Sequence, residues 1–296
     1  MATVAAEPDG PVVMEESTAS RILRFLGRTP VYILVIILGL LWLVPTFGLL
    51  LTSLIVPEEV ASTGWWEVLS TPSLGTLDNY RDILDNEAIT SAIWTTLWIS
   101  LGATAIPIVI AALAGYAFAW LEFPGRDWLF LVVVALLVVP IQMALIPIFS
   151  LYNDLGLFDT ILGLILFHTA FGLPFAIFLL RNFFIGIPKD LIEAARIDGA
   201  SEMRIFARLI LPLGLPAIAS LAIFQFLWVW NDLLVALTFG QETQPITVAI
   251  FSQLRQFGAN IELIAPAAFL SLAIPLAVFF AFQRYFVQGL LAGSVK

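Results

Sequence analysis

Six segments of the chain, each about 20 residues or longer, consist almost entirely of apolar side chains. Inside a lipid bilayer, the backbone of such a segment satisfies its hydrogen bonds only as a helix, and about 20 helical residues cross the hydrocarbon core. The sequence therefore predicts an all-α, polytopic membrane protein with six transmembrane helices. The predicted spans cover residues 31–56, 93–120, 128–152, 160–180, 213–239 and 264–286.

The composition excludes several other classes of protein. Of the 296 residues, 60% are hydrophobic and 12% are charged, whereas a soluble domain is about half apolar and a quarter charged. The net charge of −9 argues against a surface that binds nucleic acid. Because the chain has no cysteine and one histidine, His168, disulfides and metal sites built from cysteine or several histidines are excluded. We expect His168 to form a hydrogen bond between helices.

The distribution of positive charge predicts the orientation in the membrane. With six spans, both termini lie on one side, and that side carries eleven of the 13 lysines and arginines. The other side carries Arg81 and Arg255. Because cytoplasmic loops are enriched in lysine and arginine, we expect both termini in the cytoplasm and the chain in the plasma membrane. Residues 57–90 and 240–263 then form polar outer loops.

The chain has a distinct N-terminal tail. Residues 1–20 are acidic, small and without aromatic side chains, so we expect a disordered cytoplasmic tail. Residues 21–296 contain no clear internal repeat and no low-complexity tract. We expect them to form a single transmembrane domain.

The sequence lacks the motifs of an energy-converting enzyme. It has no G-x-x-x-x-G-K-[ST] loop to hold phosphates, no H-E-x-x-H and no G-x-S-x-G. No span carries a series of acidic residues for a proton relay. We therefore expect a non-catalytic transport subunit with no cofactor of its own, which depends on a partner for energy.

A charged segment, residues 187–212, interrupts the apolar second half of the chain. Pro188 suits the first turn of a helix, and Gly199 is the residue type preferred at a left-handed helix end. Ser201 is suited to capping a second helix that continues into the fifth span. The segment therefore predicts a short helix, a glycine corner and a rising helix.

The short helix has a small apolar face that Leu191, Ala194 and Ala195 form by their spacing. Glu193 and Arg196 lie one turn apart and are expected to pair weakly. The pattern allows two interpretations. One is a solvated helix in a cytoplasmic loop, and the other is a helix that docks into a groove on a cytosolic partner.

The residues of this segment resemble the E-A-A-x3-G-x9-I-x-L-P motif of permeases from ATP-binding-cassette (ABC) importers. The chain departs from that motif at one position, where Leu209 replaces isoleucine. Segments 113–126, 155–166, 226–232 and 289–296 extend the resemblance to the carbohydrate branch, especially to the second permease of maltose-type systems. It covers about residues 25–296.

The resemblance implies a fold, partners and a coupling site. It implies the type I ABC importer permease fold, with a cytoplasmic coupling helix between spans four and five. The implied partners are a second homologous permease, two cytosolic ATPase subunits that bind ATP and magnesium, and an extracytoplasmic solute-binding protein, besides membrane lipid. The implied ATPase-coupling residues are Glu193, Ala194, Ala195, Asp198, Gly199 and Pro212.

Polar residues within the predicted spans are candidates for the pore. Asn231 and Asp232 follow Trp228 in the predicted fifth span, and Gln142 lies in the third. Charged side chains are costly in lipid and usually face a cavity or a partner, so we interpret these four residues as possible pore or gate positions. The alternative is a hydrogen bond between helices. The resemblance implies that sugar contacts belong largely to the other permease.

The function expected from these observations is one half of the pore of an ATP-driven importer for a disaccharide or oligosaccharide. One alternative is a permease of the same superfamily for another solute, such as glycerol phosphate or a peptide. A second alternative is a self-sufficient secondary transporter, which would need coupling-ion sites near the midplane of the membrane.

The predicted orientation can be tested by labelling, because the chain has no native cysteine. An impermeant thiol reagent applied to intact cells should label Ser73→Cys and leave Ser17→Cys unlabelled until the membrane is permeabilised. The reverse pattern would overturn the topology.

Overall fold

The helices of the protein follow the apolar segments of its sequence. A computed structural model describes residues 18–255 and 261–292, and these residues form helices and turns without a strand. The α-helices are α1 (Thr18–Thr52), α2 (Asp78–Asp85), α3 (Glu87–Trp120), α4 (Arg126–Leu136), α5 (Ile141–Leu155), α6 (Ile161–Ile185), α7 (Lys189–Ile197), α8 (Glu202–Ile205), α9 (Leu211–Trp230), α10 (Leu234–Phe239), α11 (Ile246–Arg255) and α12 (Ile261–Ala292). Shorter helical turns are η1 (Trp65–Leu69), η2 (Pro72–Leu74) and η3 (Phe206–Ile210).

The chain divides into two units, residues 1–49 and residues 50–296. The described part of the first unit is formed by α1, whose segment Thr29–Thr52 is long and apolar enough to cross a membrane. Residues 1–17 of the predicted tail lie outside the described residues, as do residues 256–260 of a predicted outer loop. The last three residues of the predicted tail, 18–20, form the start of α1.

The predicted number of spans is confirmed only if one of them is counted as broken. Besides α1, the helices α3, α6 and α12 and the segment Glu202–Trp230 are long and apolar enough to cross a membrane. α4 and α5 pass the same test only together, and they are bent by 98°. Pro140 lies at the bend, where it lacks an N–H and disfavours helical backbone in the preceding residue. The predicted third span, 128–152, is therefore broken at this bend.

The predicted fifth span, 213–239, is also interrupted. α9 ends at Trp230, and Asn231 and Asp232 lie between α9 and α10. The prediction that these two polar residues lie inside a continuous span is therefore wrong. The carboxylate of Asp232 accepts hydrogen bonds from the first turn of α10, including one of 2.9 Å from the N–H of Ala236. A polar side chain at this position supplies partners for backbone groups that the interruption leaves free.

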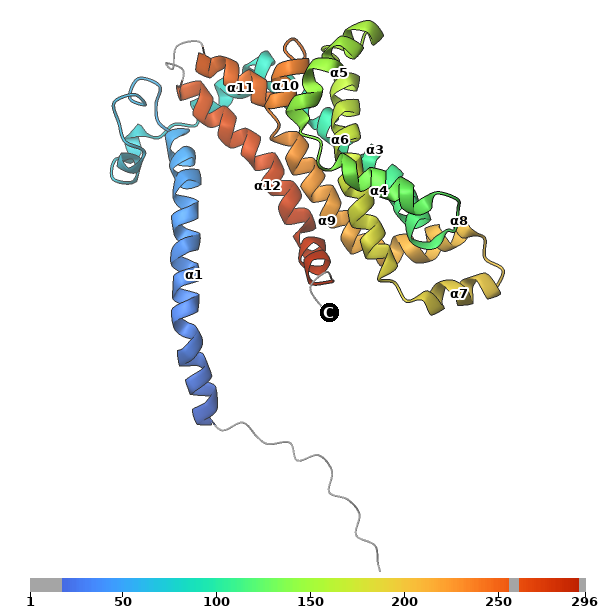
Figure 1. Cartoon of the computed structure of the whole chain (residues 1–296). Coiled ribbons are helices and arrows are strands. Elements are labelled where there is room, and N and C mark those ends of the chain that lie inside the picture. Colours follow the sequence, from blue (N-terminus) through green and yellow to red (C-terminus); the bar gives the residue numbers. More distant parts are fainter. Residues whose placement is uncertain (1–17, 256–260, 293–296) are drawn as a thin grey trace, which may run out of the picture. The chain divides into compact units, whose positions relative to one another are not determined.

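The second unit is a bundle in which α3, α6 and α9 pack together and α12 packs along α9 (Figure 1). Figure 1 shows α7 and α8 at one end of this bundle and α10 and α11 at the other. One buried hydrophobic cluster joins Tyr116 of α3, Phe184 of α6 and Ile192 of α7. The cluster seats α7 directly on the hydrophobic core, so the charged segment has a fixed position on the bundle.

Candidate functional site

The helix α7 turns one face to the bundle and the opposite face outward. Ile192 is fully buried, and Ala195 packs against the same hydrophobic cluster. The outward apolar residues are Leu191, Ala194 and Ile197, and Ile197 is 86% exposed. The predicted apolar face is therefore wrong in one member. Ala195 belongs to the seat of the helix, and Ile197 completes the outward face.

A residue in the left-handed backbone conformation follows the end of α7, as predicted. Gly199 has a φ of 77°, and the N–H of Ala200 donates to the carbonyl of Ala195 at 3.0 Å, which is typical of a Schellman cap. A Cβ at Gly199 would have no atom within 4 Å, so the backbone conformation alone favours glycine. Asp198 is exposed beside it. Ser201 precedes α8 as predicted, but its side chain makes no cap hydrogen bond.

A network of hydrogen bonds fastens this corner to the end of α3. The guanidinium of Arg196 donates to Glu202 at 2.9 Å and to the carbonyl of Trp120 at 3.1 Å. The hydroxyl of Tyr116 donates to the other carboxylate oxygen of Glu202. Tyr116, Trp120, Arg196 and Glu202 are called the corner network below. The network joins α3, α7 and α8, and the sequence pattern alone did not predict it.

The predicted pair of Glu193 with Arg196 is wrong. Glu193 instead pairs with Lys189, whose Nζ lies 2.8 Å from Oε1 of the carboxylate. The hydrogen bond from Lys189 lowers the pKa of Glu193, which keeps this exposed carboxylate ionised. The hydrogen bond to Glu202 raises the pKa of Arg196. Glu193 and Arg196 therefore have different partners, Glu193 on its own helix and Arg196 on the next.

The helix that rises from the corner contains one wider turn. η3 is a π-helical turn, in which the N–H of Leu211 donates to the carbonyl of Phe206. Pro212 follows, and a proline within a helix has no N–H to donate and crowds the carbonyl four residues earlier. The extra residue in the turn relieves this crowding. Turns of this type are frequent at functional sites.

Polar side chains meet where α6 passes the end of α9. His168 is 2% exposed, and its Nε2 lies 3.7 Å from Oδ2 of Asp232, which is longer than a hydrogen bond. Its Nδ1 has no partner within the described part of the chain. The imidazole ring meets the indole of Trp228 edge-on, with centroids 5.2 Å apart. Asn231 is exposed, and its side chain donates to the carbonyl of Leu227 in α9. Instead of the hydrogen bond predicted for it, the side chain of His168 has a longer contact with Asp232.

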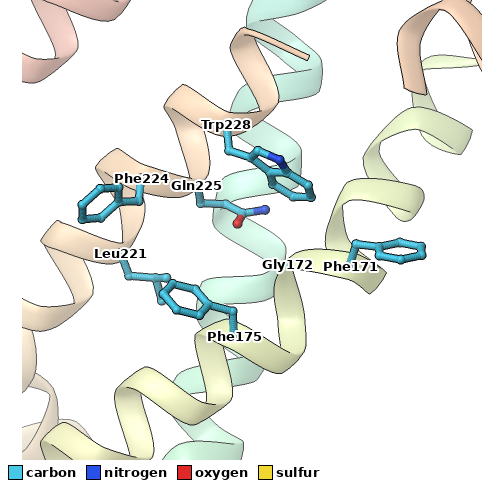
Figure 2. A pocket seen from close by; sticks show the side chains of 7 residues that line it. All are labelled: Phe171, Gly172, Phe175, Leu221, Phe224, Gln225 and Trp228. Atoms are coloured by element: carbon cyan, nitrogen blue, oxygen red, sulfur yellow. The ribbon is translucent and has the colours of Figure 1, made fainter. Parts of the chain in front are cut away.

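A groove of about 330 Å³ lies beside this cluster, between α6 and α9 (Figure 2). Its lining residues are Phe171, Gly172, Phe175, Leu221, Phe224, Gln225 and Trp228. Gln225 is 5% exposed and donates to the carbonyls of Ala103, at 3.0 Å, and His168, at 3.4 Å. A Cβ at Gly172 would lie 2.4 Å from the same amide nitrogen. The glycine therefore leaves room for a glutamine that joins α9 to α3 and α6.

Of the four predicted pore or gate residues, the structure brings Trp228 and Asp232 together around His168. Gln142 does not join this group. It lies in the first turn of α5 and is exposed. Residues 18–255 and 261–292 contain no group of three or more histidine, aspartate or glutamate side chains that could hold a metal ion.

At the end of the bundle opposite α7, two side chains hold the segments that follow α9. The carboxylate of Asp159 accepts hydrogen bonds of 2.9 Å from the N–H groups of residues 242 and 243. The hydroxyl of Thr96 accepts one of 2.7 Å from the N–H of Ile246, the first residue of α11. These bonds fix the beginning of the predicted loop 240–263, which also contains the helix α11.

A family model described as "Binding-protein-dependent transport system inner membrane component" matches residues 107–291, which is more than half of the chain. The chain belongs to this family. The matched residues begin within α3 and include the corner network, the groove and most of α12. The protein is therefore a multi-pass membrane component of a transport system.

Relatives and a solved structure agree with this assignment. The osmoprotective compounds uptake permease protein GgtD of Synechocystis is 48% identical over 286 residues, or 95% of this chain and 96% of that protein. The alpha-glucoside transport system permease protein AglG of Rhizobium meliloti is 51% identical over 235 residues, or 77% of this chain and 62% of that protein. A crystal structure of a bacterial ABC transporter that imports alginate matches with a TM-score of 0.74 at 22% identity, covering 92% of this chain and 99% of that chain. The predicted type I importer permease fold is confirmed.

Substitution of Gly199 tests whether its left-handed backbone sets the orientation of α7. Gly199→Val should strain the backbone by about 1–2 kcal/mol and tilt α7, so that sugar uptake is lost at normal membrane levels of the protein. Gly199→Asn should be milder, because asparagine tolerates this conformation better. Uptake and the amount of the variant in the membrane are measured in the same cells.

Gly156→Val is the matched control, because Gly156 also has a positive φ, 66°, and open space around its Cβ position. It ends α5, away from α7. Equal uptake by Gly199→Val and the wild type would show that the corner is an ordinary solvated loop.

Proposed function

We propose that this permease subunit forms one half of the translocation pathway of an ATP-driven sugar importer and receives the energy of ATP hydrolysis through α7. The position of α7 carries the proposal. The residues that match E-A-A-x3-G lie on a short charged helix seated on the end of a transmembrane bundle. The chain has no phosphate-binding loop, so ATP and magnesium bind to a partner and this subunit is not itself an enzyme.

The outward face of α7 is suited to a preformed cleft on an ATPase subunit. Leu191, Ala194 and Ile197 provide an apolar surface, and Ala194 allows close approach of another backbone. Glu193 lies beside this surface and is ionised. Charged groups around an apolar centre fix the register of docking, whereas the buried apolar side chains supply most of the binding free energy.

The complete importer then contains this chain, a second homologous permease, two cytosolic ATPase subunits and an extracytoplasmic solute-binding protein. The positive charges support cytoplasmic termini and a cytoplasmic α7. In that orientation α10, α11 and the segment fixed by Asp159 face outward. We assign this outer surface to contact with the solute-binding protein.

The names of the relatives support a carbohydrate as the transported solute. AglG is a permease for alpha-glucosides, and the matching solved structure belongs to an importer of a polysaccharide. GgtD matches over more of the chain and is named for osmoprotective compounds. The second candidate function is therefore uptake of an osmoprotective compound through the same pathway.

A screen of solutes with the purified complex tests both candidates. Trehalose, maltose and longer alpha-glucosides are added with the solute-binding protein, and glycine betaine is added as a non-sugar osmoprotectant. We expect an alpha-glucoside to stimulate ATP hydrolysis several-fold. Stimulation by glycine betaine alone would favour the second candidate, and absence of an ATPase from the purified complex would reject the importer assignment itself.

Charge substitutions on the outward face of α7 test the docking surface. Leu191→Asp and Ile197→Asp should each weaken retention of the ATPase by about tenfold, the effect of losing one well-packed interface side chain. The measurement is the ATPase content of complexes purified through this subunit.

Leu69→Asp is the matched control, because Leu69 is 62% exposed and lies in η1, within the predicted outer loop. It should leave ATPase retention unchanged. Retention at the wild-type level in both α7 variants would exclude this face as the docking surface.

A further inference from the structure

The cytoplasmic end of α3 is held by the corner that α7 and α8 form. Tyr116 is 4% exposed, and its hydroxyl donates to Glu202 of α8. One turn later, the carbonyl of Trp120 accepts a hydrogen bond from Arg196 of α7. The indole of Trp120 also donates to the carbonyl of Phe184 in α6, at 3.0 Å. A displacement of α7 therefore acts on α3 directly, as well as on the helix that follows α8.

The other end of α3 is bonded to the start of α11. Thr96 is 2% exposed, donates to the carbonyl of Ala92 at 2.7 Å and accepts from the N–H of Ile246 at 2.7 Å. The hydroxyl of Thr96 therefore caps α11, a helix that comes much later in the sequence than α3. Ile246 is fully buried in a cluster that also contains Ala92. The position of α11 is therefore tied to that of α3.

Between these two contacts, α3 is a continuous helix packed closely on α6. Thr96 and Tyr116 are 20 residues apart, which corresponds to about 30 Å of helix and to the thickness of the hydrocarbon core. A Cβ at Gly115 would lie 3.0 Å from the backbone nitrogen of Arg181. This close approach leaves α3 and α6 little freedom to slide past each other.

We propose that α3 is the element that links the ATPase-facing corner to the outer surface formed by α10 and α11, with Tyr116 and Thr96 as its two positioning residues. The inference rests on the proposed function, because it assigns the two ends to an ATPase and to a solute-binding protein. It predicts that a change at either end of α3 alters how strongly the loaded solute-binding protein stimulates ATP hydrolysis, while the complex itself stays assembled.

The test uses the complete importer reconstituted in lipid vesicles. Tyr116→Phe removes the hydroxyl that binds Glu202, and Thr96→Val removes the cap of α11 with little change in volume. Thr96→Ser keeps that hydroxyl. Tyr152→Phe is the matched control, because it removes a buried tyrosine hydroxyl bonded to the carbonyl of Gly163 and does not touch α3 through that bond. ATP hydrolysis is measured with and without the loaded solute-binding protein, together with ATPase retention.

The stimulation ratio is the rate of ATP hydrolysis with the loaded solute-binding protein divided by the rate without it. We expect Tyr116→Phe and Thr96→Val each to lower this ratio by about fivefold, because one ordinary hydrogen bond contributes about 1 kcal/mol. ATPase retention should be unchanged, Thr96→Ser should restore stimulation, and Tyr152→Phe should behave as the wild type. The double variant should lose no more than the worse single variant, because both residues act through one element.

Three outcomes would overturn the inference. Unchanged stimulation in both single variants would show that α3 is not the link. Losses that multiply in the double variant would show two independent local effects. Loss of the ATPase from the Tyr116→Phe complex would show that this contact only holds α7 in place. A wild-type complex that contains no ATPase would instead reject the proposed function.

Discussion

Backbone N–H and C=O groups within a bilayer must find partners inside the protein, and this requirement organises the structure. It makes the spans helical, and it determines where the helices can be interrupted. At one interruption the carboxylate of Asp232 binds the first turn of α10. Side chains of Asn86 and Thr160 likewise accept hydrogen bonds at the starts of α3 and α6. Asp232, Asn86 and Thr160 thus serve backbone groups at the starts of helices, where intrahelical partners are missing.

The same principle distinguishes the charged corner from the groove between α6 and α9. The charged corner lies at one end of the bundle, where water and a partner can satisfy its side chains. The groove between α6 and α9 is aromatic, and its glutamine has its amide nitrogen bonded to backbone carbonyls. Because Gln225 joins three helices, the groove has a wall that is fixed by hydrogen bonds rather than by packing alone.

The sequence predicted those features that depend on local chemistry. Gly199 is an example, because a glycine after a helix-forming segment signals a left-handed end whatever surrounds it. The sequence did not predict which side of α7 faces the bundle, so Ala195 was assigned to the docking face and Ile197 was left out of it. Likewise, the contact of Tyr116 with Glu202 joins residues 86 positions apart, and no periodicity within either segment indicates its partner. The sequence also did not distinguish Pro140, where the helix breaks, from prolines such as Pro107 and Pro174, which lie inside α3 and α6.

The π-helical turn before Pro212 sets the rotational phase between the corner and the membrane. An α-helix advances about 100° per residue, and the wider turn of η3 takes up one additional residue without that rotation. If the same residues formed a regular α-helix, the carboxylate of Glu202 would be rotated by about 100° away from Tyr116 while every apolar residue of α9 kept its place. The hydrogen bond between Tyr116 and Glu202 therefore depends on the wide turn as well as on the two side chains. A further insertion in this stretch would change the direction in which the corner faces without altering the bundle that carries it.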